Sequence, residues 1–163
     1  MMLILGVDPG ASGGCAWVNT DAPEFMQAAK LPATEADIAS LFKGFCVDGH
    51  GPAFAYLERV NAMPGQGVTS MFSFGRSYGF LRGCLVALGI PFDDVTPGKW
   101  QKALGLTRAN KDESITSKKN RHKQRAQQLF PHLKITHAIA DATLLCEFGR
   151  RLRAGELQAK VAG

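Results

Sequence analysis

An apolar run near the start of the chain ends in an acid and a glycine-rich turn. Residues 3–7 (LILGV) are apolar or small, which is typical of a strand buried on both faces of a sheet. Asp8 follows this strand, and the Pro-Gly and Gly-Gly steps after it predict a tight turn that leaves its carboxylate open to a ligand. An acid before Pro-Gly also fits a plain β-turn, so other acids must decide between the two interpretations.

The remainder of the 163 residues predicts a mixed α/β fold. Three strands followed by helices that alternate with two more strands is the order of the ribonuclease H-like fold, a five-stranded mixed sheet flanked by helices. The length suits one domain spanning residues 1–163. Apolar runs and turn residues predict the further strands at 15–19, 24–30, 53–57 and 92–96, and helical spacing predicts helices at 34–45, 69–88, 97–104, 118–130 and 138–152.

Further acids stand where they can join Asp8. Glu58 ends the fourth predicted strand, which in the ribonuclease H-like order is the parallel neighbour of the first, so both carboxylates would lie at the same edge of the sheet. Asp141 is the only acid in the first turn of the last predicted helix, and His137 lies four residues earlier on the same face. Alone, Asp141 fits a helix-start acid and His137 a flanking polar residue, but their joint placement favours a site.

Three converging carboxylates need a cation between them. At about 5 Å and an effective dielectric constant of about 20, each like-charged pair costs roughly 3 kcal/mol. Oxygen ligands with one imidazole suit Mg²⁺, with Mn²⁺ as a substitute, and two such ions would activate a water and stabilise the leaving oxygen of a phosphodiester. We therefore expect Asp8, Glu58 and Asp141 to be metal ligands and catalytic residues of a nuclease, with His137 either a further ligand or a catalytic group that orients the attacking water.

The positive charge of the chain is concentrated in one stretch. The net charge is +5, but residues 99–134 hold ten Lys or Arg against two acids, a net +8, which leaves −3 for the rest. A clustered basic stretch favours a nucleic-acid partner, although such runs are also common as solvated faces. The DNA-binding candidates that we take from this stretch are Lys99, Lys111, Lys118, Lys119, Arg121 and Lys123.

The predicted helix at 69–88 carries two further features. Phe72 and Phe74 follow the loop at 61–67 and are either core residues or platforms for unpaired bases, with Arg76 beside them as a further DNA contact. Glycines recur every four residues at 75, 79 and 83, which indicates a backbone that something approaches closely, either the chain's own sheet or the same helix of a second chain.

Other classes of protein are disfavoured. The four cysteines fall inside apolar patterns without the spacing of a zinc or redox motif, so we expect reduced core residues. The sequence has no export signal and no apolar run of membrane-spanning length, so we expect a cytoplasmic protein without membrane association or a small-molecule cofactor.

The chain resembles the RuvC-like Holliday junction resolvases, and among them phage or prophage members. The resemblance rests on GVDPG at 6–10, LERV at 57–60, MPGQG at 63–67 with MFSFG at 71–75, TPGKW at 96–100, and DA at 141–142 with EFGRR at 147–151. It implies a homodimeric, Mg²⁺-dependent endonuclease that nicks two strands of a four-way DNA junction symmetrically in a bacterial or phage-infected cell, with Asp8, Glu58 and Asp141 as ligands. Bacterial members commonly carry another acid three residues before the last one, where this chain has Ala138, so His137 is the nearest candidate for a fourth ligand.

Two other functions remain open at this point. A nuclease acting on RNA–DNA hybrids, or a less selective branched-DNA nuclease, would use the same acids on the same fold. A DNA-binding protein with a vestigial site would keep the basic stretch without binding metal.

Overall fold

The computed structural model describes residues 1–47, 51–59, 61–62, 64–108 and 110–157. Val60 and Met63, which belong to the resemblance and to the loop predicted after Glu58, lie outside the described residues. The elements are β1 (Leu3–Asp8), β2 (Gly14–Asn19), the 3₁₀ turn η1 (Pro23–Phe25), β3 (Gln27–Lys30), α1 (Glu35–Gly44), β4 (Ala53–Glu58), α2 (Val68–Ala87), β5 (Phe92–Val95), α3 (Pro97–Ala103), α4 (Ile115–Leu129) and α5 (His137–Arg153).

The strands form the predicted five-stranded mixed sheet. Their order is β3-β2-β1-β4-β5, with β1 antiparallel to β2 and parallel to β4. Val7 pairs with Leu57, so the carboxyl ends of β1 and β4 finish side by side. The register therefore brings Asp8 and Glu58 to one edge of the sheet, as the order of elements predicts.

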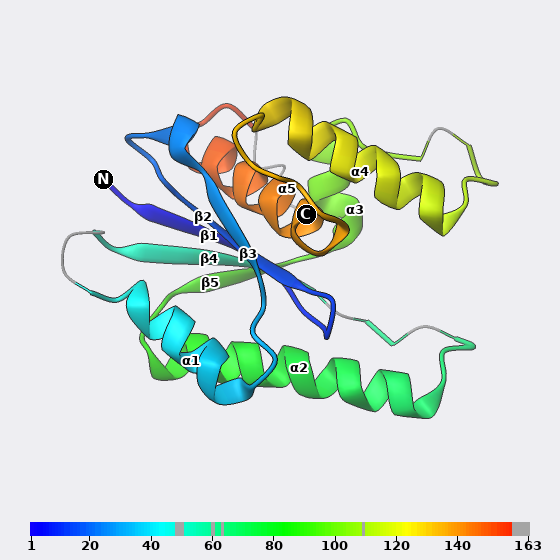
Figure 1. Cartoon of the computed structure of the whole chain (residues 1–163), viewed down its shortest axis with the longest axis horizontal. Coiled ribbons are helices and arrows are strands. Elements are labelled where there is room, and N and C mark those ends of the chain that lie inside the picture. The colour runs from blue at the N-terminus through cyan, green and yellow to red at the C-terminus, as the bar shows by residue number, and fades with distance from the viewer. Residues whose placement is uncertain (48–50, 60, 63, 109, 158–163) are drawn as a thin grey trace, which may run out of the picture.

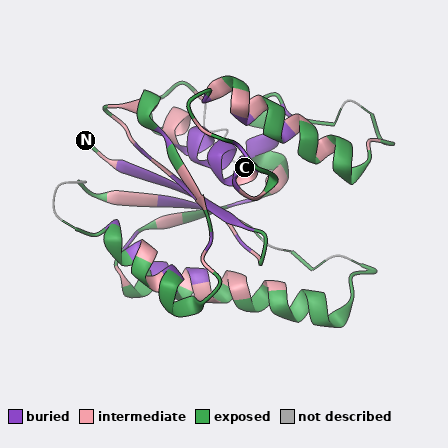
Figure 2. Cartoon of the chain, viewed as in Figure 1, coloured by how far each residue is buried: buried purple, intermediate pink, exposed green. Residues whose placement is uncertain are grey.

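Helices cover both faces of the sheet. Figure 1 shows α1 and α2 on one face and α3, α4 and α5 on the other. Each layer closes its own apolar core: one contains Phe42, Leu81 and Leu85, and the other contains Trp100 and Leu144. In Figure 2 the strands and α5 carry most of the buried residues, whereas α2 and α4 expose long faces.

Close backbone contacts set α5 against the central strands. At Gly6 in β1, a Cβ atom would overlap backbone atoms of Ala142 and Cys146 of α5. At Gly149 in α5, a Cβ atom would overlap the ring of Tyr56 in β4. Glycine is needed at both positions because no side chain fits there, and the resulting contact places the first turns of α5 beside the end of β1.

Among the predicted boundaries that differ from the structure are the starts of β3, α4 and α5. β3 begins at Gln27 rather than at residue 24, because the preceding chain forms η1 from Pro23, which has no N–H for a strand ladder. α4 begins three residues earlier than predicted, because Ser114 caps it by accepting a hydrogen bond from the N–H of Ser117. α5 begins at His137, so Asp141 lies in its second turn and not, as predicted, in its first.

The glycine stripe of α2 does not pack on the sheet. A Cβ atom at Gly75, Gly79 or Gly83 would meet no atom of the described residues within 4 Å, so the interpretation of these glycines as a close contact with the chain's own sheet is wrong. The buried side of this helix consists of Leu81, Cys84 and Leu85. The stripe lies on the exposed part of the helix.

Three of the four cysteines are buried, as predicted, but Cys46 is exposed because it follows the end of α1, where the chain leaves the core. Within the described part of the chain, none of the helices combines the length and the apolar character that crossing a membrane requires.

Candidate functional site

Three carboxylates converge at the edge of the sheet. Asp8 stands at the end of β1, Glu58 at the end of β4, and Asp141 in the second turn of α5. One oxygen of each lies within 4.8 Å of the others, and all three side chains are partly exposed. An all-oxygen set of this kind fits a hard divalent cation such as Mg²⁺ or Mn²⁺. The predicted cluster of acids is therefore formed by the fold.

Burial and mutual repulsion disfavour the charged forms of two of these acids. The pKa of Asp8 is raised well above its ordinary value, first because burial removes the carboxylate from water and then because Glu58 and Asp141 are close. Burial also raises the pKa of Glu58, against the lowering effect of hydrogen bonds from Asp8 and Trp100. Without a cation, burial and repulsion therefore favour the protonated forms of Asp8 and Glu58, whereas binding a metal favours their ionised forms.

Each of the other two acids is held by a ring from the helical layer. The indole Nε1 of Trp100 in α3 donates to Oε1 of Glu58 at 3.2 Å. The ring nitrogen Nδ1 of His122 in α4 lies 2.8 Å from Oδ1 of Asp141. The two rings pack edge to face with their centroids 5.3 Å apart. Glu58 and Asp141 are thus each hydrogen-bonded to one of two buried rings that pack against each other.

His122 was not among the predicted site residues, although its position carries a signal. It shares a helical face with Ala126 and Leu129, four and seven residues later, in a helix whose other residues are mostly polar. A histidine on the only apolar face of a helix is expected to be buried and to need a polar partner. Trp100 was named only as part of the TPGKW motif at 96–100, and no role was predicted for it.

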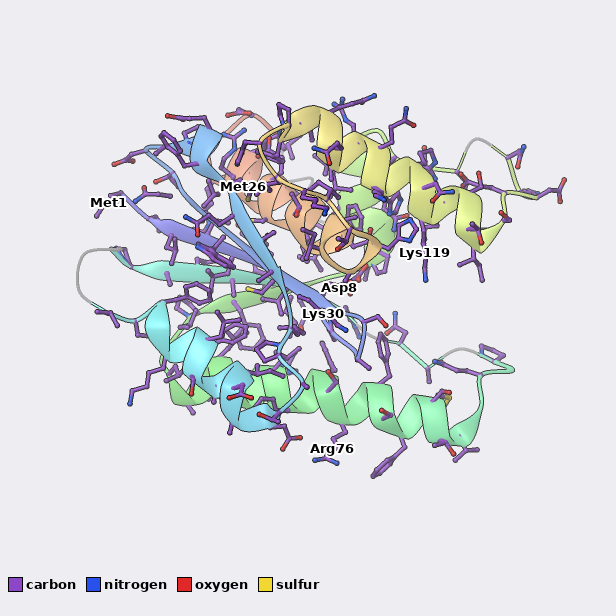
Figure 3. The ribbon with its side chains drawn as sticks, viewed as in Figure 1. Met1, Asp8, Met26, Lys30, Arg76 and Lys119 are labelled. Atoms are coloured by element: carbon purple, nitrogen blue, oxygen red, sulfur yellow. The ribbon has the colours of Figure 1, made fainter. Side chains whose placement is uncertain are left out.

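An open cavity of about 620 Å³ is lined by two of the three acids, Asp8 and Asp141. Its walls include the turn from Asp8 to Ser12, the start of α5, and the side chains of Phe74, Lys30 and Lys119. Figure 3 labels Asp8, Lys30 and Lys119 at this end of the sheet. Lys119 lowers the pKa of Asp8 against the effect of the other acids, so its ammonium group acts on the cluster. Lys30 at the end of β3 was not predicted, because it lies outside the basic stretch.

His137 lies at the cavity but not in the acid cluster. It is exposed at the first position of α5 and lines the cavity with Asp8 and Asp141. Its Nε2 lies 3.0 Å from Oδ1 of Asn120 in α4, and it is not among the residues that come within 4.8 Å of one another. The structure therefore places this predicted ligand on the rim.

The predicted basic residues separate into different environments. Lys118 and Lys119 lie close enough to the acids to lower the pKa of Glu58 and Asp8, respectively. Arg121 instead makes a two-pronged ion pair with Glu113, with both distances 2.9 Å, and donates to the carbonyl of Leu106, which holds the segment before α4. The guanidinium of Arg121 is therefore engaged within the chain, and its contact with DNA stays a prediction.

The other predicted DNA contacts are on exposed surfaces. Lys99, Lys111 and Lys123 are exposed, and Lys123 lines a shallow hollow on α4. Arg76 is paired with Glu35 of α1 at 3.0 Å and remains largely exposed.

The two phenylalanines of α2 have different surroundings. Phe72 is 75% exposed, whereas Phe74 is half-buried and lines the cavity. The ring of Phe74 covers Gly10, whose φ of 110° favours glycine, and Ser77 accepts a hydrogen bond from the N–H of Gly10 at 3.1 Å. Phe74 and Ser77 therefore brace the turn that follows Asp8, while Phe72 faces solvent.

Solved structures of RuvC share this fold. The chain superposes on Thermus thermophilus RuvC with a TM-score of 0.61 at 14% sequence identity, over 96% of this chain and 99% of that one. The T. thermophilus RuvC in complex with a Holliday junction substrate gives a TM-score of 0.60 with the same identity and coverage. No protein-family model matches the sequence, and no curated protein matches it significantly. The resemblance to RuvC-like proteins is confirmed at the level of the fold.

Proposed function

We propose that this protein is a divalent-metal-dependent endonuclease that resolves four-way DNA junctions by paired, symmetric hydrolysis of two phosphodiesters. One observation carries the proposal: on the RuvC fold, the carboxylates of Asp8, Glu58 and Asp141 gather within 4.8 Å of one another, and Asp8 and Asp141 line an open cavity. Lysines of α4 lie beside them. Anionic DNA and a site for cations are thereby brought to the same end of the sheet.

The chemistry follows from these neighbours. Mg²⁺, bound as two ions, would supply an activated water and a positive charge near the leaving oxygen. Lys30 and Lys119 on the cavity wall attract a phosphate towards the acids. His137, on the rim, either joins the metal ligands or orients the attacking water through a hydrogen bond.

The working unit that we propose is a homodimer. A four-way junction presents two symmetry-related phosphates, and one acid cluster per chain can cut only one of them, so paired cutting requires two chains related by a two-fold axis. The exposed stripe of Gly75, Gly79 and Gly83, with nothing within 4 Å of its missing side chains among the described residues, would let two α2 helices approach closely. Branched DNA inside a bacterial or phage-infected cell would be the substrate.

The substrate is tested with end-labelled DNAs. A four-way junction, a linear duplex, a splayed duplex and an RNA–DNA hybrid are each incubated with Mg²⁺, Mn²⁺ or chelator. We expect symmetric paired cuts in the junction alone, with either metal and not with chelator. Preferential cutting of the hybrid, or equal cutting of all substrates, would replace junction resolution by one of the broader nuclease functions. Binding to the junction without cutting by any metal would favour a non-catalytic DNA-binding protein.

The acid cluster is tested by removing one charge at a time. Asp8→Asn, Glu58→Gln and Asp141→Asn should each abolish cleavage while junction binding in chelator persists, because the basic residues are untouched. Glu24→Gln is the matched control, since Glu24 is exposed in η1 and lies outside the cluster. A near-normal Mg²⁺-dependent rate for any of the three variants would remove that residue from the metal site.

A further inference from the structure

The imidazole of His122 is buried in an unusual way. Its residue is 1% exposed, on the side of α4 that faces the core. Nδ1 lies 2.8 Å from Oδ1 of Asp141, and Nε2 is buried with no hydrogen-bond partner among the described residues. Burying a ring nitrogen without a partner costs free energy, so an apolar side chain would fill this space more favourably. The histidine is therefore explained by its single bond to Asp141.

We infer that His122 is a positioning residue that holds the Asp141 carboxylate in the orientation needed to bind a divalent cation. The inference rests on the metal site of the proposed function. A carboxylate that ligates a metal can only accept hydrogen bonds, so Nδ1 must carry the hydrogen. That bond occupies one lone pair of Oδ1 and leaves Oδ2 and the other Oδ1 lone pair for a cation. Ligand carboxylates in metal sites are commonly oriented by such hydrogen bonds.

The ring of His122 is itself held in place. It packs edge to face on Trp100, with centroids 5.3 Å apart and planes inclined by 62°. Trp100 is fully buried and donates to Glu58, so its own orientation is also set. An imidazole packed in this way cannot turn freely, and its hydrogen bond therefore limits rotation of the Asp141 side chain, which is 33% exposed at the cavity.

The same hydrogen bond also links the metal site to the basic helix. His122 lies one helical turn after Lys118 and Lys119, whose ammonium groups act on Glu58 and Asp8. Helix α4 thus carries two candidate phosphate-binding residues and the group that orients a ligand. A shift of α4 on DNA would move the Asp141 carboxylate with it.

The test replaces His122 in two ways. His122→Leu removes the N–H donor and keeps an apolar side chain, whereas His122→Asn keeps an N–H near the position of Nδ1. The affinity for Mn²⁺ is measured by calorimetry and by electron paramagnetic resonance on the DNA-free protein. We expect His122→Leu to bind Mn²⁺ about tenfold or more weakly, in the range typical of such supporting residues, and His122→Asn to recover most of the loss.

Two controls separate positioning from folding. His132→Leu removes another histidine bond, from Nε2 to the carbonyl of Met26 at 2.8 Å, from a residue outside the cavity, and should leave Mn²⁺ affinity unchanged. Thermal unfolding in chelator reports whether each variant is folded. Junction binding in chelator should be equal for both His122 variants and the parent, because the lysines of α4 are kept.

The outcomes are distinct. A folded His122→Leu protein with parental Mn²⁺ affinity, or a folded His122→Asn protein as weak as His122→Leu, would overturn the inference. A parent that binds no Mn²⁺ would also overturn it. A parent that binds Mn²⁺ but cuts no junction contradicts the proposed function, and weakened metal binding by His122→Leu would then still support the positioning role.

Discussion

The indole Nε1 of Trp100 donates a hydrogen bond to Oε1 of Glu58 across 3.2 Å, joining the start of α3 to the end of β4. The bond follows from the topology, because β5 pairs with β4 and leads through Thr96 directly into α3. Trp100 is also fully buried, so it serves the core and the site at once. Because Trp100 does not line the cavity, a substitution of Trp100 changes the support of Glu58 without changing the cavity wall.

Trp100→Phe should weaken metal binding while keeping most of the core packing, because it removes the N–H donor and keeps an aromatic ring. Where Mg²⁺ supports cleavage, we expect the half-saturating Mg²⁺ concentration to rise by about tenfold. The measurement is cleavage rate against Mg²⁺ concentration, with Trp17→Phe in β2 as the control. Equal Mg²⁺ dependence of Trp100→Phe and parent would show that this bond does not support Glu58.

Asp8→Asn should stabilise the metal-free protein at neutral pH. A carboxylate whose pKa is raised in the folded state disfavours folding once it is ionised, so the parent loses stability as pH rises from the ordinary carboxyl range through the raised pKa of Asp8. We expect a gain on the order of 1 kcal/mol for Asp8→Asn near pH 7, because a charged carboxylate is no longer buried and like-charge repulsion is relieved.

The measurement is urea unfolding in chelator between about pH 5 and pH 8. The difference between variant and parent should shrink as pH falls, and added Mg²⁺ should stabilise the parent far more than the variant. A difference that does not change with pH would show that Asp8 is ionised throughout this range.

His137→Ala should slow Mg²⁺-dependent cleavage by at least about tenfold, the lower range for loss of a positioned acid–base group. Asn120→Ala should slow it less, because Asn120 acts only through its 3.0 Å contact with His137 Nε2. Single-turnover rates at saturating Mg²⁺ give the comparison, with His132→Ala as the control. A His137→Ala protein with the parental rate would make His137 a rim residue without a catalytic role.

The lysines of α4 should make DNA binding depend on salt. If the protein binds about six phosphates, its affinity for DNA should fall about a thousandfold between about 50 and 200 mM salt. Replacing Lys118, Lys119 and Lys123 together by Gln should flatten that slope by about one unit for each phosphate that the variant no longer binds. Arg121 is left in place, because its ion pair with Glu113 holds the segment before α4.

Fluorescence anisotropy with a junction in chelator measures the slopes. Lys43→Gln is the control, since Lys43 is exposed on α1 in the opposite helical layer. Equal slopes for the triple variant and the parent would identify α4 as a solvated basic face.

Gly79→Leu should weaken dimerisation. Within one chain the new side chain meets no described atom within 4 Å of its Cβ, so a loss of association would report on a second chain rather than on strain. Analytical ultracentrifugation measures the dimer, and a supercoiled cruciform plasmid should give more singly nicked circles and less linear product. Gly44→Leu, at an equally open helical glycine of α1, is the control.

Two results would contradict this prediction at different levels. A parent that stays monomeric on junction DNA and still makes paired cuts would exclude the dimer. A folded and fully dimeric Gly79→Leu protein would exclude only α2 as its interface.

Much of the fold could be predicted because it depends on local pattern. The apolar run at residues 3–7, the turn after Asp8 and the strand before Glu58 each specify an element and its neighbour, and the order of elements then makes β1 and β4 parallel partners. The order of the elements was therefore enough to predict that Asp8 and Glu58 lie side by side. The third acid, Asp141, followed from the helix pattern, although α5 begins one residue earlier than predicted.

What the sequence determined by itself was therefore the sheet, its order and the acids at its edge, because periodicity and turn residues act over a few neighbours. What only the tertiary structure decided was how those acids are held and which basic residues reach them. His122 and Asp141 are 19 residues apart in the sequence, and Trp100 and Glu58 are 42 apart, so no local pattern links the members of either pair. Lys30 belongs to β3, an edge strand of the sheet, and no local pattern places it beside the acids either. The bonds of Trp100 to Glu58 and of His122 to Asp141 arise only when α3 and α4 pack beside β4 and α5, and the same packing leaves His137 on the rim of the cavity.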